Sequence, residues 1–431
     1  AWIDRTAADE GIDVMSGSLR VLFVNRMASL VRGGGETFDL EISANLEKKG
    51  VEVHYLTGAP LIAHTPMPLH HARAHEIRSP YLPWFPWDRM KGGWRVRVWE
   101  FAQFENRAAA WINRHQDRFD IVQICELPRL VTLLKTRYAI RPKIVMRLTA
   151  PNAYDPTGGT RRADAVIASG TSIAIIRRGE RPDVHNIPNA VATDCFRPDD
   201  GAGRLAWRQR HGIPADALVL VYVARLQGFK NHALLVEALA RIAAEEPSVR
   251  LVLAGSGPLR GDVERKAHAA GVADRLLFLG EVPFTELPDV YRAADLKVIA
   301  SEYESFCFAA IEGMASGLPV VTTDCGWVPT LIGDTLAPIE QQSVRGPDPS
   351  DRFASMNPGA QQRDVPGGIV TGRSDPSSLA RALLRLWRDE TLRRRTAGWN
   401  REKAVREHGW DSSAGKLLDL YSEVRNRRSE A

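Results

Sequence analysis

Short, wholly apolar runs recur along this chain, each followed by a stretch with helical periodicity, and this alternation limits the fold more than any other feature. The first run, residues 21–25, is rich in β-formers, and a helical pattern over 38–49 follows it after a glycine-rich loop. Apolar runs without polar alternation are typical of parallel strands buried on both faces. Strand–helix alternation along the whole chain therefore predicts an α/β protein with parallel sheets.

The same rhythm continues through both halves of the chain. Further strands are expected at 51–57, 121–125, 143–147, 165–169, 218–223, 250–254, 276–279, 296–300 and 319–322. Helices are expected at 232–244, at 261–270 and from about residue 377 onward. A length of 431 residues suits two domains of ordinary size. Proline, aspartate and glycine cluster between residues 186 and 201, which marks the expected break.

Composition argues against several classes of protein. No apolar run reaches the ~18 residues that a membrane span needs, and the polar first residues do not resemble a signal peptide. The basic residues behind the net charge of +5 are spread out, which is unlike a nucleic-acid-binding protein but suits an anionic substrate or a membrane surface. The cysteines form no C-x-x-C pair, so neither zinc nor a disulfide framework is expected, and a reducing cytosol fits: Cys125, Cys195, Cys307 and Cys325.

The sharpest constellation of polar residues follows the expected strand 296–300. Glu304 falls in the loop after that strand, and Glu312 lies eight positions later in the expected helix. Ligands of open α/β sheets bind at the carboxyl ends of strands, and a helix N-terminus attracts phosphate. The element could therefore hold a diphosphate between two carboxylates that accept hydrogen bonds from sugar hydroxyls. For an isolated pair of carboxylates, two solvated surface charges are the more common explanation.

Three other loops carry weaker signals. Arg225 and Lys230 follow the expected strand 218–223, and an arginine fork with a lysine point charge can converge on one diphosphate. Gly255-Ser256-Gly257 and the loop 33–36 (Gly-Gly-Gly-Glu) also follow strands, where glycines permit positive φ angles and close backbone approach. Taken alone, the first two loops are more often a pair of solvated cations and a plain strand-to-helix turn, and a plain turn explains residues 33–36 equally well.

Together these segments resemble glycosyltransferase family 4, a large family of retaining enzymes with the GT-B fold. Its E-x7-E signature, written E-S/G-F-G-x4-E-A-M-A-x-G-x-P-V, is matched at Glu304, Ser305, Phe306, Glu312, Met314, Ala315, Gly317, Pro319 and Val320. Cys307 replaces the usual glycine, and Gly313 the usual alanine. Segments 223–231, 186–191 and 33–36 are similar to the family's G-R-L-x3-K-G, I-P-N-G-V and G-G-x-E segments, respectively.

The resemblance implies roles for individual residues. Glu304 would contact the donor sugar, Glu312 the ribose, and Arg225 with Lys230 would neutralise the leaving diphosphate. The remaining implied donor-binding residues are Gly34, Gly35, Gly255, Gly257, Ser305, Phe306 and Cys307. The implied acceptor-side residues are Glu36, Cys125 and Glu126.

One departure from the family lies in the acceptor half. Residues 120–128 resemble D-V-x-H-x-H-E-x, but Gln123 and Cys125 stand where the histidines would be, and Glu126 keeps its place. Either the histidine role has moved or the acceptor chemistry differs.

The resemblance implies a GT-B architecture, with two Rossmann-like domains facing a cleft. The N-terminal acceptor-side domain is expected over 18–188, with 409–431 as a returning helix, and the nucleotide-sugar-binding domain over 189–408. The expected reaction is retaining transfer of a hexose from a nucleotide diphosphate sugar, UDP ahead of GDP, to a glycan, lipid-linked or small-molecule hydroxyl. No strand ends in D-x-D, so we expect neither a metal nor a further cofactor.

Alternatives remain open. A GT-B nucleotide-sugar epimerase or a non-catalytic nucleotide-binding protein would also bind a diphosphate, whereas an NAD oxidoreductase is disfavoured because residues 33–36 lack G-x-G-x-x-G spacing. Residues 338–366 resemble an insertion loop, and residues 80–101 interleave aromatic and basic side chains: Trp84, Trp87, Trp94 and Trp99 with Arg89, Lys91, Arg95 and Arg97. Such a segment more often covers a domain core or caps an insertion. The alternative is that it binds a lipid-linked acceptor or gives an otherwise cytoplasmic protein a peripheral contact with the inner membrane.

Overall fold

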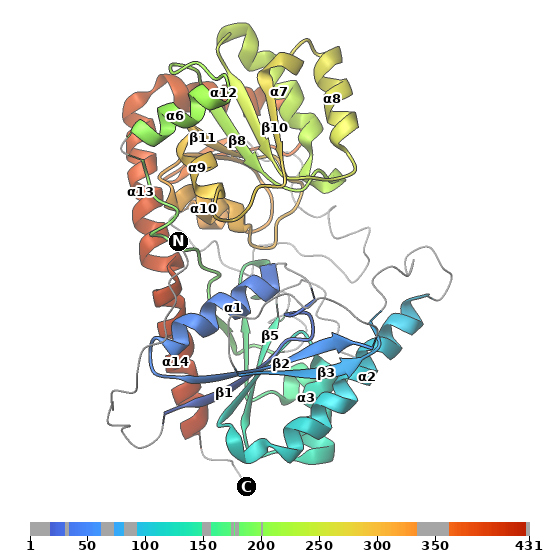
Figure 1. Cartoon of the computed structure of the whole chain (residues 1–431). Coiled ribbons are helices and arrows are strands. Elements are labelled where there is room, and N and C mark those ends of the chain that lie inside the picture. Colours follow the sequence, from blue (N-terminus) through green and yellow to red (C-terminus); the bar gives the residue numbers. More distant parts are fainter. Residues whose placement is uncertain are drawn as a thin grey trace. The chain divides into compact units, whose positions relative to one another are not determined.

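The computed structural model describes residues 18–30, 34–61, 73–81, 93–148, 157–173, 176, 181–199, 201–333 and 362–427. The chain divides into two compact units (Figure 1). The first comprises Ala1–Met146, Thr157–Asp164 and Leu418–Ala431, and the second comprises Arg147–Pro156 and Ala165–Leu417. The domain limits expected from the sequence remain a prediction.

The first sheet has the strand order β3-β2-β1-β4-β5-β6-β7. Its strands are β1 (Arg20–Val24), β2 (Glu52–Pro60), β3 (Ala74–Ser79), β4 (Ile121–Cys125), β5 (Lys143–Leu148), β6 (Ala165–Ala168) and β7 (Val184–Asn186). The pairs β1–β2, β1–β4, β2–β3 and β6–β7 are parallel. Strands β3 and β7 were not expected, because their short sequences carry charged or polar residues and lack a clear apolar run.

The second sheet has the order β10-β9-β8-β11-β12-β14-β13. Its strands are β8 (Val219–Val223), β9 (Arg250–Ala254), β10 (Leu276–Gly280), β11 (Leu296–Ile299), β12 (Val320–Thr323), β13 (Arg363–Val365) and β14 (Gly368–Thr371). Every pair in it is parallel except β13–β14, which is antiparallel. The expected parallel sheet is therefore confirmed except for this edge hairpin. Its tight turn follows the expected insertion loop, of which 338–361 lies outside the described residues.

The helices alternate with the strands. They are α1 (Gly34–Glu47), α2 (Gly93–Arg114), α3 (Pro128–Thr132), α4 (Gly159–Arg162), α6 (Ala202–Arg210), α7 (His232–Glu245), α8 (Arg260–Ala269), α9 (Leu287–Arg292), α10 (Phe308–Ala315), α11 (Val328–Leu331), α12 (Pro376–Arg388), α13 (Glu390–His408) and α14 (Trp410–Asn426). Short helical turns occur at Gln116–Arg118, Leu133–Tyr138, Gly228–Lys230 and Ala273–Arg275.

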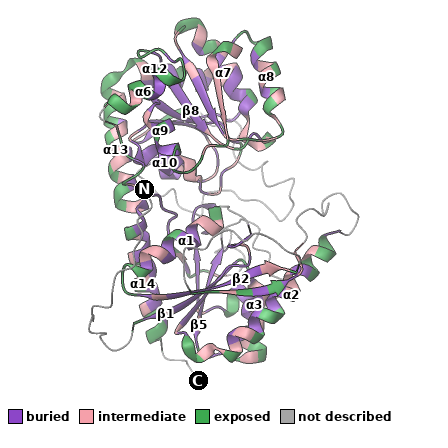
Figure 2. Ribbon diagram, in the orientation of Figure 1, coloured by how far each residue is buried: buried purple, intermediate pink, exposed green. Residues whose placement is uncertain are grey.

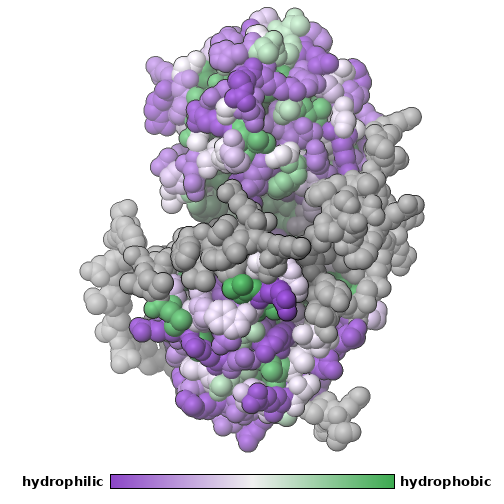
Figure 3. Space-filling model, turned by 90° about the vertical axis from the view of Figure 1, so that its right-hand side faces the viewer, coloured by the Kyte–Doolittle hydropathy of each residue, from purple (hydrophilic) through white to green (hydrophobic). Residues whose placement is uncertain are grey.

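The core of the second unit lies on both faces of its sheet. Val219 and Val221 of β8 join one apolar cluster, which includes side chains of α9 and α10. Leu220 joins the other, which includes side chains of α7, α8 and α12. Successive strand residues point to opposite faces, so a strand covered on both faces must be apolar throughout. Figure 2 shows the strands buried and the outer faces of the helices exposed, and on the face in Figure 3 hydrophobic side chains are scattered among hydrophilic ones.

Candidate active site

Each sheet reverses its direction of growth next to its first strand. In the second sheet β8 lies between β9 and β11, and in the first β1 lies between β2 and β4. At such a switch point the loops that leave the two central strands diverge to opposite faces, which opens a binding position at their carboxyl ends. The loops after β8 and β11 contain Lys230 and Glu304. Glu36 lies in the first turn of the helix that follows β1, and Glu126 lies in the loop after β4.

Lys230 and Glu304 meet at the switch point of the second sheet. The lysine Nζ lies 2.5 Å from the Glu304 Oε1, and the two side chains are only 16% and 11% exposed. The Ser301 hydroxyl donates to the same oxygen at 2.6 Å. Two donors on one oxygen fix the carboxylate, and limited exposure to water strengthens the ion pair. Glu304, which was expected to contact the sugar, and Lys230, which was expected to neutralise the diphosphate, are therefore in direct contact.

Further hydrogen bonds hold the two loops together. The Glu302 amide donates to the Phe229 carbonyl at 2.8 Å. The Tyr222 hydroxyl, on β8, lies 2.8 Å from the Lys230 carbonyl oxygen and 2.9 Å from the Ser301 Oγ. Burial raises the pKa of Tyr222 well above its ordinary value, so it remains protonated. These contacts position Lys230 before any ligand arrives, which is what a preorganised site requires.

Glu312 lies on α10 and is buried. The Tyr291 hydroxyl, on α9, donates to its Oε2 at 2.7 Å. Burial raises the pKa of the Glu312 carboxyl, while the Tyr291 hydrogen bond and the Lys297 cation oppose that rise. The carboxylate is oriented by α9, and it can accept a ligand hydroxyl only from the side that Tyr291 leaves open.

Cys307 precedes α10 and has an unusual backbone conformation. Its φ is +75°, in the left-handed region that β-carbons disfavour. This conformation explains why glycine is usual at the matching position of the resembled motif. Burial raises the pKa of the thiol, so Cys307 is not a nucleophilic thiolate. Ser305 precedes it, and the buried Phe306 joins the apolar cluster below α10.

Arg225 projects from a loop that packs against the glycine turn after β9. A β-carbon at Gly255, whose φ is +141°, would lie 2.1 Å from the Ala224 carbonyl oxygen, and one at Gly257 would lie 2.4 Å from that of Leu226. These glycines therefore shape the loop of Arg225. The Arg225 side chain is exposed, and no described residue forms a hydrogen bond or ion pair with its guanidinium.

The residues expected on the acceptor side lie in the first unit. Glu36 lies in the first turn of α1, and Gly34 and Gly35, which were expected among the donor-binding residues, open this helix and so also belong to the first unit. Cys125 ends β4 and is buried, while Glu126 is exposed with a φ of +55°. A non-glycine residue in this conformation is a strained feature common at functional sites. Gln123 also lies at a position where the family carries histidine. It is buried, and its Oε1 accepts a hydrogen bond of 2.5 Å from the Tyr421 hydroxyl of α14.

Four contributors were missed by the sequence reasoning. Tyr222, Tyr291, Ser301 and Lys297 all touch or neighbour the two carboxylates. Only Lys297 had a visible signal, since a lysine inside the otherwise apolar run Leu-Lys-Val-Ile is rare in a buried strand. The hydroxyl groups had none, because they become polar contacts only through the tertiary fold.

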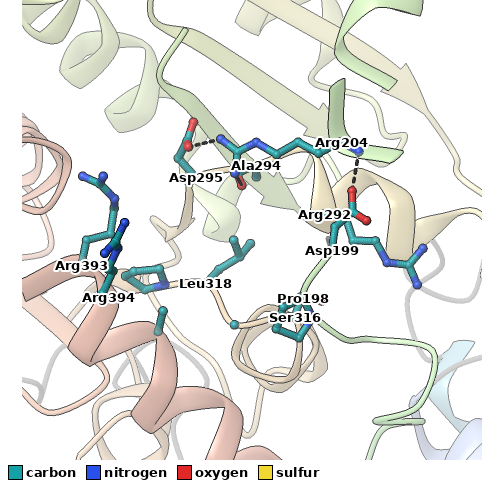
Figure 4. Close-up of a pocket in the computed structure, with 13 residues that line it drawn as sticks. Pro198, Asp199, Arg204, Arg292, Ala294, Asp295, Ser316, Leu318, Arg393 and Arg394 are labelled. Carbon is teal, nitrogen blue, oxygen red and sulfur yellow. Dashed lines mark hydrogen bonds and ion pairs between the residues drawn. The ribbon is translucent and has the colours of Figure 1, made fainter. Parts of the chain in front are cut away.

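A cavity lies in the second unit near the amino ends of the strands of its sheet, away from the carboxyl ends that carry Lys230 and Glu304. It has a volume of about 220 Å³ and is lined by Arg204, Arg292, Asp295, Pro319 and other residues near the starts of β11 and β12 (Figure 4). Arg204 pairs with Asp295, and Arg292 pairs with Asp289 at 2.5 Å. Because these arginines already have partners, and the carboxyl ends of the strands point away, this cavity is not part of the site.

The described residues contain neither a cluster of metal ligands nor a membrane-spanning helix. None of these residues belongs to a group of three or more His, Cys, Asp or Glu side chains that could hold a metal ion. None of the described helices is long and apolar enough to cross a membrane.

Comparison with known proteins finds consistent likenesses. Residues 203–341 match the family model of glycosyl transferases group 1. A D-inositol 3-phosphate glycosyltransferase of Xylanimonas cellulosilytica is 28% identical over 426 residues, covering 92% of this chain and 93% of that protein. Sucrose-phosphate synthase from Thermosynechococcus elongatus has a TM-score of 0.70 at 19% identity, covering 94% and 99% of the two chains. Anabaena Alr3699/HepE in complex with UDP has a TM-score of 0.69 at 17% identity, covering 94% and 100%.

Proposed function

From the premise that this chain is a glycosyltransferase with the GT-B fold, we propose that it transfers a hexose from a nucleotide diphosphate sugar to a hydroxyl acceptor, with retention and without a metal. The premise itself is shown by the family match and the relatives, which confirm the fold class and the family resemblance predicted from the motifs. Retention, metal independence and the roles of individual residues are the proposal.

The observation that carries the proposal is the meeting of Lys230 and Glu304 at the switch point of the second sheet. Glycosyl transfer develops negative charge on the departing diphosphate. Hydrogen-bond donors and cations that are preorganised around that charge usually make the largest single contribution to catalysis. Lys230, the exposed Arg225 and the first amides of α10 would supply them. A fixed lysine with an arginine in the same loop supports a reaction that needs no divalent ion.

The donor would lie along the carboxyl edge of the second sheet. Glu312, oriented by Tyr291, would accept the ribose hydroxyls, and Glu304 would contact the sugar. We propose UDP ahead of GDP as the carrier. The structural likeness to a protein crystallised with UDP supports this choice.

The acceptor would be bound by Glu36, Cys125 and Glu126 at the switch point of the first sheet. Cys125 cannot act as a base in the way histidine does, and the left-handed Glu126 presents the nearest exposed carboxylate along the chain. We therefore propose that Glu126 binds the hydroxyl group of the acceptor. The acceptor itself is proposed at the level of a glycan, a lipid-linked sugar or a small molecule.

We also propose that the enzyme is cytoplasmic and makes a peripheral contact with the inner membrane through α2. Trp94, Val98 and Trp99 are 66%, 57% and 49% exposed, and Arg95 and Arg97 lie between them. Exposed tryptophans beside arginines suit a membrane interface and do not cover a core. The other aromatic and basic residues of this expected segment lie outside the described residues: Trp84, Trp87, Arg89 and Lys91.

One assay separates the proposal from its two rivals. The full chain is incubated with UDP-hexoses and GDP-hexoses without acceptor, and the products are separated by chromatography. Slow release of nucleoside diphosphate and free sugar is expected of a glycosyltransferase. An altered nucleotide sugar with no hydrolysis would identify an epimerase, and binding with no product would identify a non-catalytic protein.

A further inference from the structure

Lys297 is a fully buried lysine on β11, the strand that leads into the E-x7-E segment. Its stem packs under α10. A β-carbon at Gly313 would lie only 3.0 Å from the Lys297 Cγ and 3.2 Å from its Cβ. Gly313 stands where the resembled motif carries alanine, so the missing methyl group leaves the room that the lysine stem fills.

The Lys297 amine has no hydrogen-bond partner in the described part of the chain. Its Nζ lies 5.5 Å from the ring centroids of both Tyr222 and Tyr291. Two aromatic faces stabilise an ammonium ion partly, but an amine without a hydrogen bond in the interior is costly and usually has a functional reason. Replacing such a residue by an apolar one would remove this cost, so packing alone does not account for it.

The two rings connect Lys297 to both carboxylates of the site. The Tyr222 hydroxyl contacts Ser301, which donates to Glu304. The Tyr291 hydroxyl donates to Glu312. Lys297 therefore lies fully buried within electrostatic reach of both acidic residues, and it can act on both through the low-dielectric interior.

We propose that Lys297 is a positioning residue of the donor site, a buried cation that supports the binding of the diphosphate through the protein interior and takes up a proton when the nucleotide binds. This inference rests on the proposed function, because it places the diphosphate at the start of α10 beside Lys230.

The charges around the amine determine the direction of the effect. Burial lowers the pKa of Lys297 to about 8. Glu304, Glu312 and Cys307 raise this pKa, and Lys230 lowers it further. The two neighbouring tyrosines stay neutral, because burial raises their pKa well above the ordinary value. An arriving diphosphate adds negative charge and raises the pKa of Lys297, so above pH 8 binding is coupled to the uptake of a fraction of a proton.

The experiment is calorimetric titration of the full chain with UDP, GDP and ADP from pH 7.5 to 9.5, in pairs of buffers that differ in ionisation enthalpy. For the nucleotide that binds, we expect an uptake of about half a proton at pH 9, with affinity falling about threefold from pH 8 to 9. Lys297→Met keeps the length of the stem without the charge. It should bind about tenfold more weakly at pH 7.5 and lose the proton uptake.

The matched control is Lys266→Met, which removes the same charge from α8, where Lys266 pairs with Glu237. It should keep the wild-type affinity and pH profile. Binding without proton uptake in the wild type, or an unchanged uptake in Lys297→Met, would overturn this inference and leave the proposed function standing. Failure of the wild type to bind any of the three nucleotides would overturn both. If Lys297→Met does not fold, the wild-type uptake decides alone.

Discussion

Lys230 and Glu304, 74 positions apart in the chain, form a largely buried ion pair at the centre of the second sheet. The pair gives Lys230 a fixed place, yet a diphosphate must compete with Glu304 for it. We expect Lys230→Ala to lower turnover about 10²–10³-fold and donor affinity much less, because the charge on the leaving group grows in the transition state. Steady-state kinetics with the donor that turns over measures both, with Lys266→Ala as the control. Near-normal turnover would place the diphosphate in another loop.

Arg225 is expected to act on the same phosphate pair. Arg225→Lys should also turn over poorly, because a point charge cannot reproduce the planar fork. Combined with Lys230→Ala, its effect should be less than additive, since both residues act on one group. Fully additive losses would mean that the two cations serve different parts of the donor.

Glu312→Ala should weaken nucleotide binding by about 1.5–3 kcal/mol, the usual value of a hydrogen bond to a charged group. The structural reason is the orientation of this carboxylate by Tyr291. Calorimetric titration with the nucleoside diphosphate measures it. Glu237→Ala, which removes a carboxylate of α7 that pairs with Lys266, is the control. An unchanged dissociation constant for Glu312→Ala would remove the ribose assignment.

Cys307→Gly should raise the stability of the protein by about 1 kcal/mol, because a β-carbon is disfavoured at a φ of +75°. Cys307→Ala is the matched comparison, since it removes the thiol but keeps the β-carbon. Urea unfolding of the three proteins should therefore rank glycine as the most stable. Equal stabilities of the glycine and alanine variants would show that the backbone at this position relaxes without cost.

Chelation should leave activity intact, because two cationic side chains are proposed to replace a divalent ion at the diphosphate. Turnover is measured before and after EDTA treatment, and again with added manganese. Activity that EDTA abolishes and manganese restores would refute the proposed metal independence.

Membrane binding through α2 should show in liposome flotation at low salt. Wild-type protein is expected to float with anionic vesicles and to be released by salt, because the basic charge is screened. Trp94→Ala with Trp99→Ala should weaken it, whereas a Trp207→Phe control on α6, whose side chain is buried, should not. Equal flotation with neutral vesicles, or none with anionic ones, would contradict the proposal.

Local sequence determined much of this protein. The runs Val-Leu-Phe-Val and Val-Leu-Val-Tyr-Val specified central strands, because a strand covered on both faces must be apolar at every position. The same rhythm placed Glu304 after a strand and Glu312 in a helix, as the structure has them. These features depend on neighbours a few residues away, which a sequence displays directly.

Only the tertiary structure decided how the site is assembled. Lys230 meets Glu304, and Tyr291 meets Glu312, because β8, α9 and β11 come together from separate parts of the chain. The left-handed Cys307 and the antiparallel β13 likewise depend on packing. Lys297 is the clearest case: the sequence shows a lysine in a strand, but only the packing of β8, α9 and β11 places its amine between Tyr222 and Tyr291, without a hydrogen bond among the described residues. Long-range contacts of this kind leave no local periodicity, so no pattern in the sequence could have predicted them.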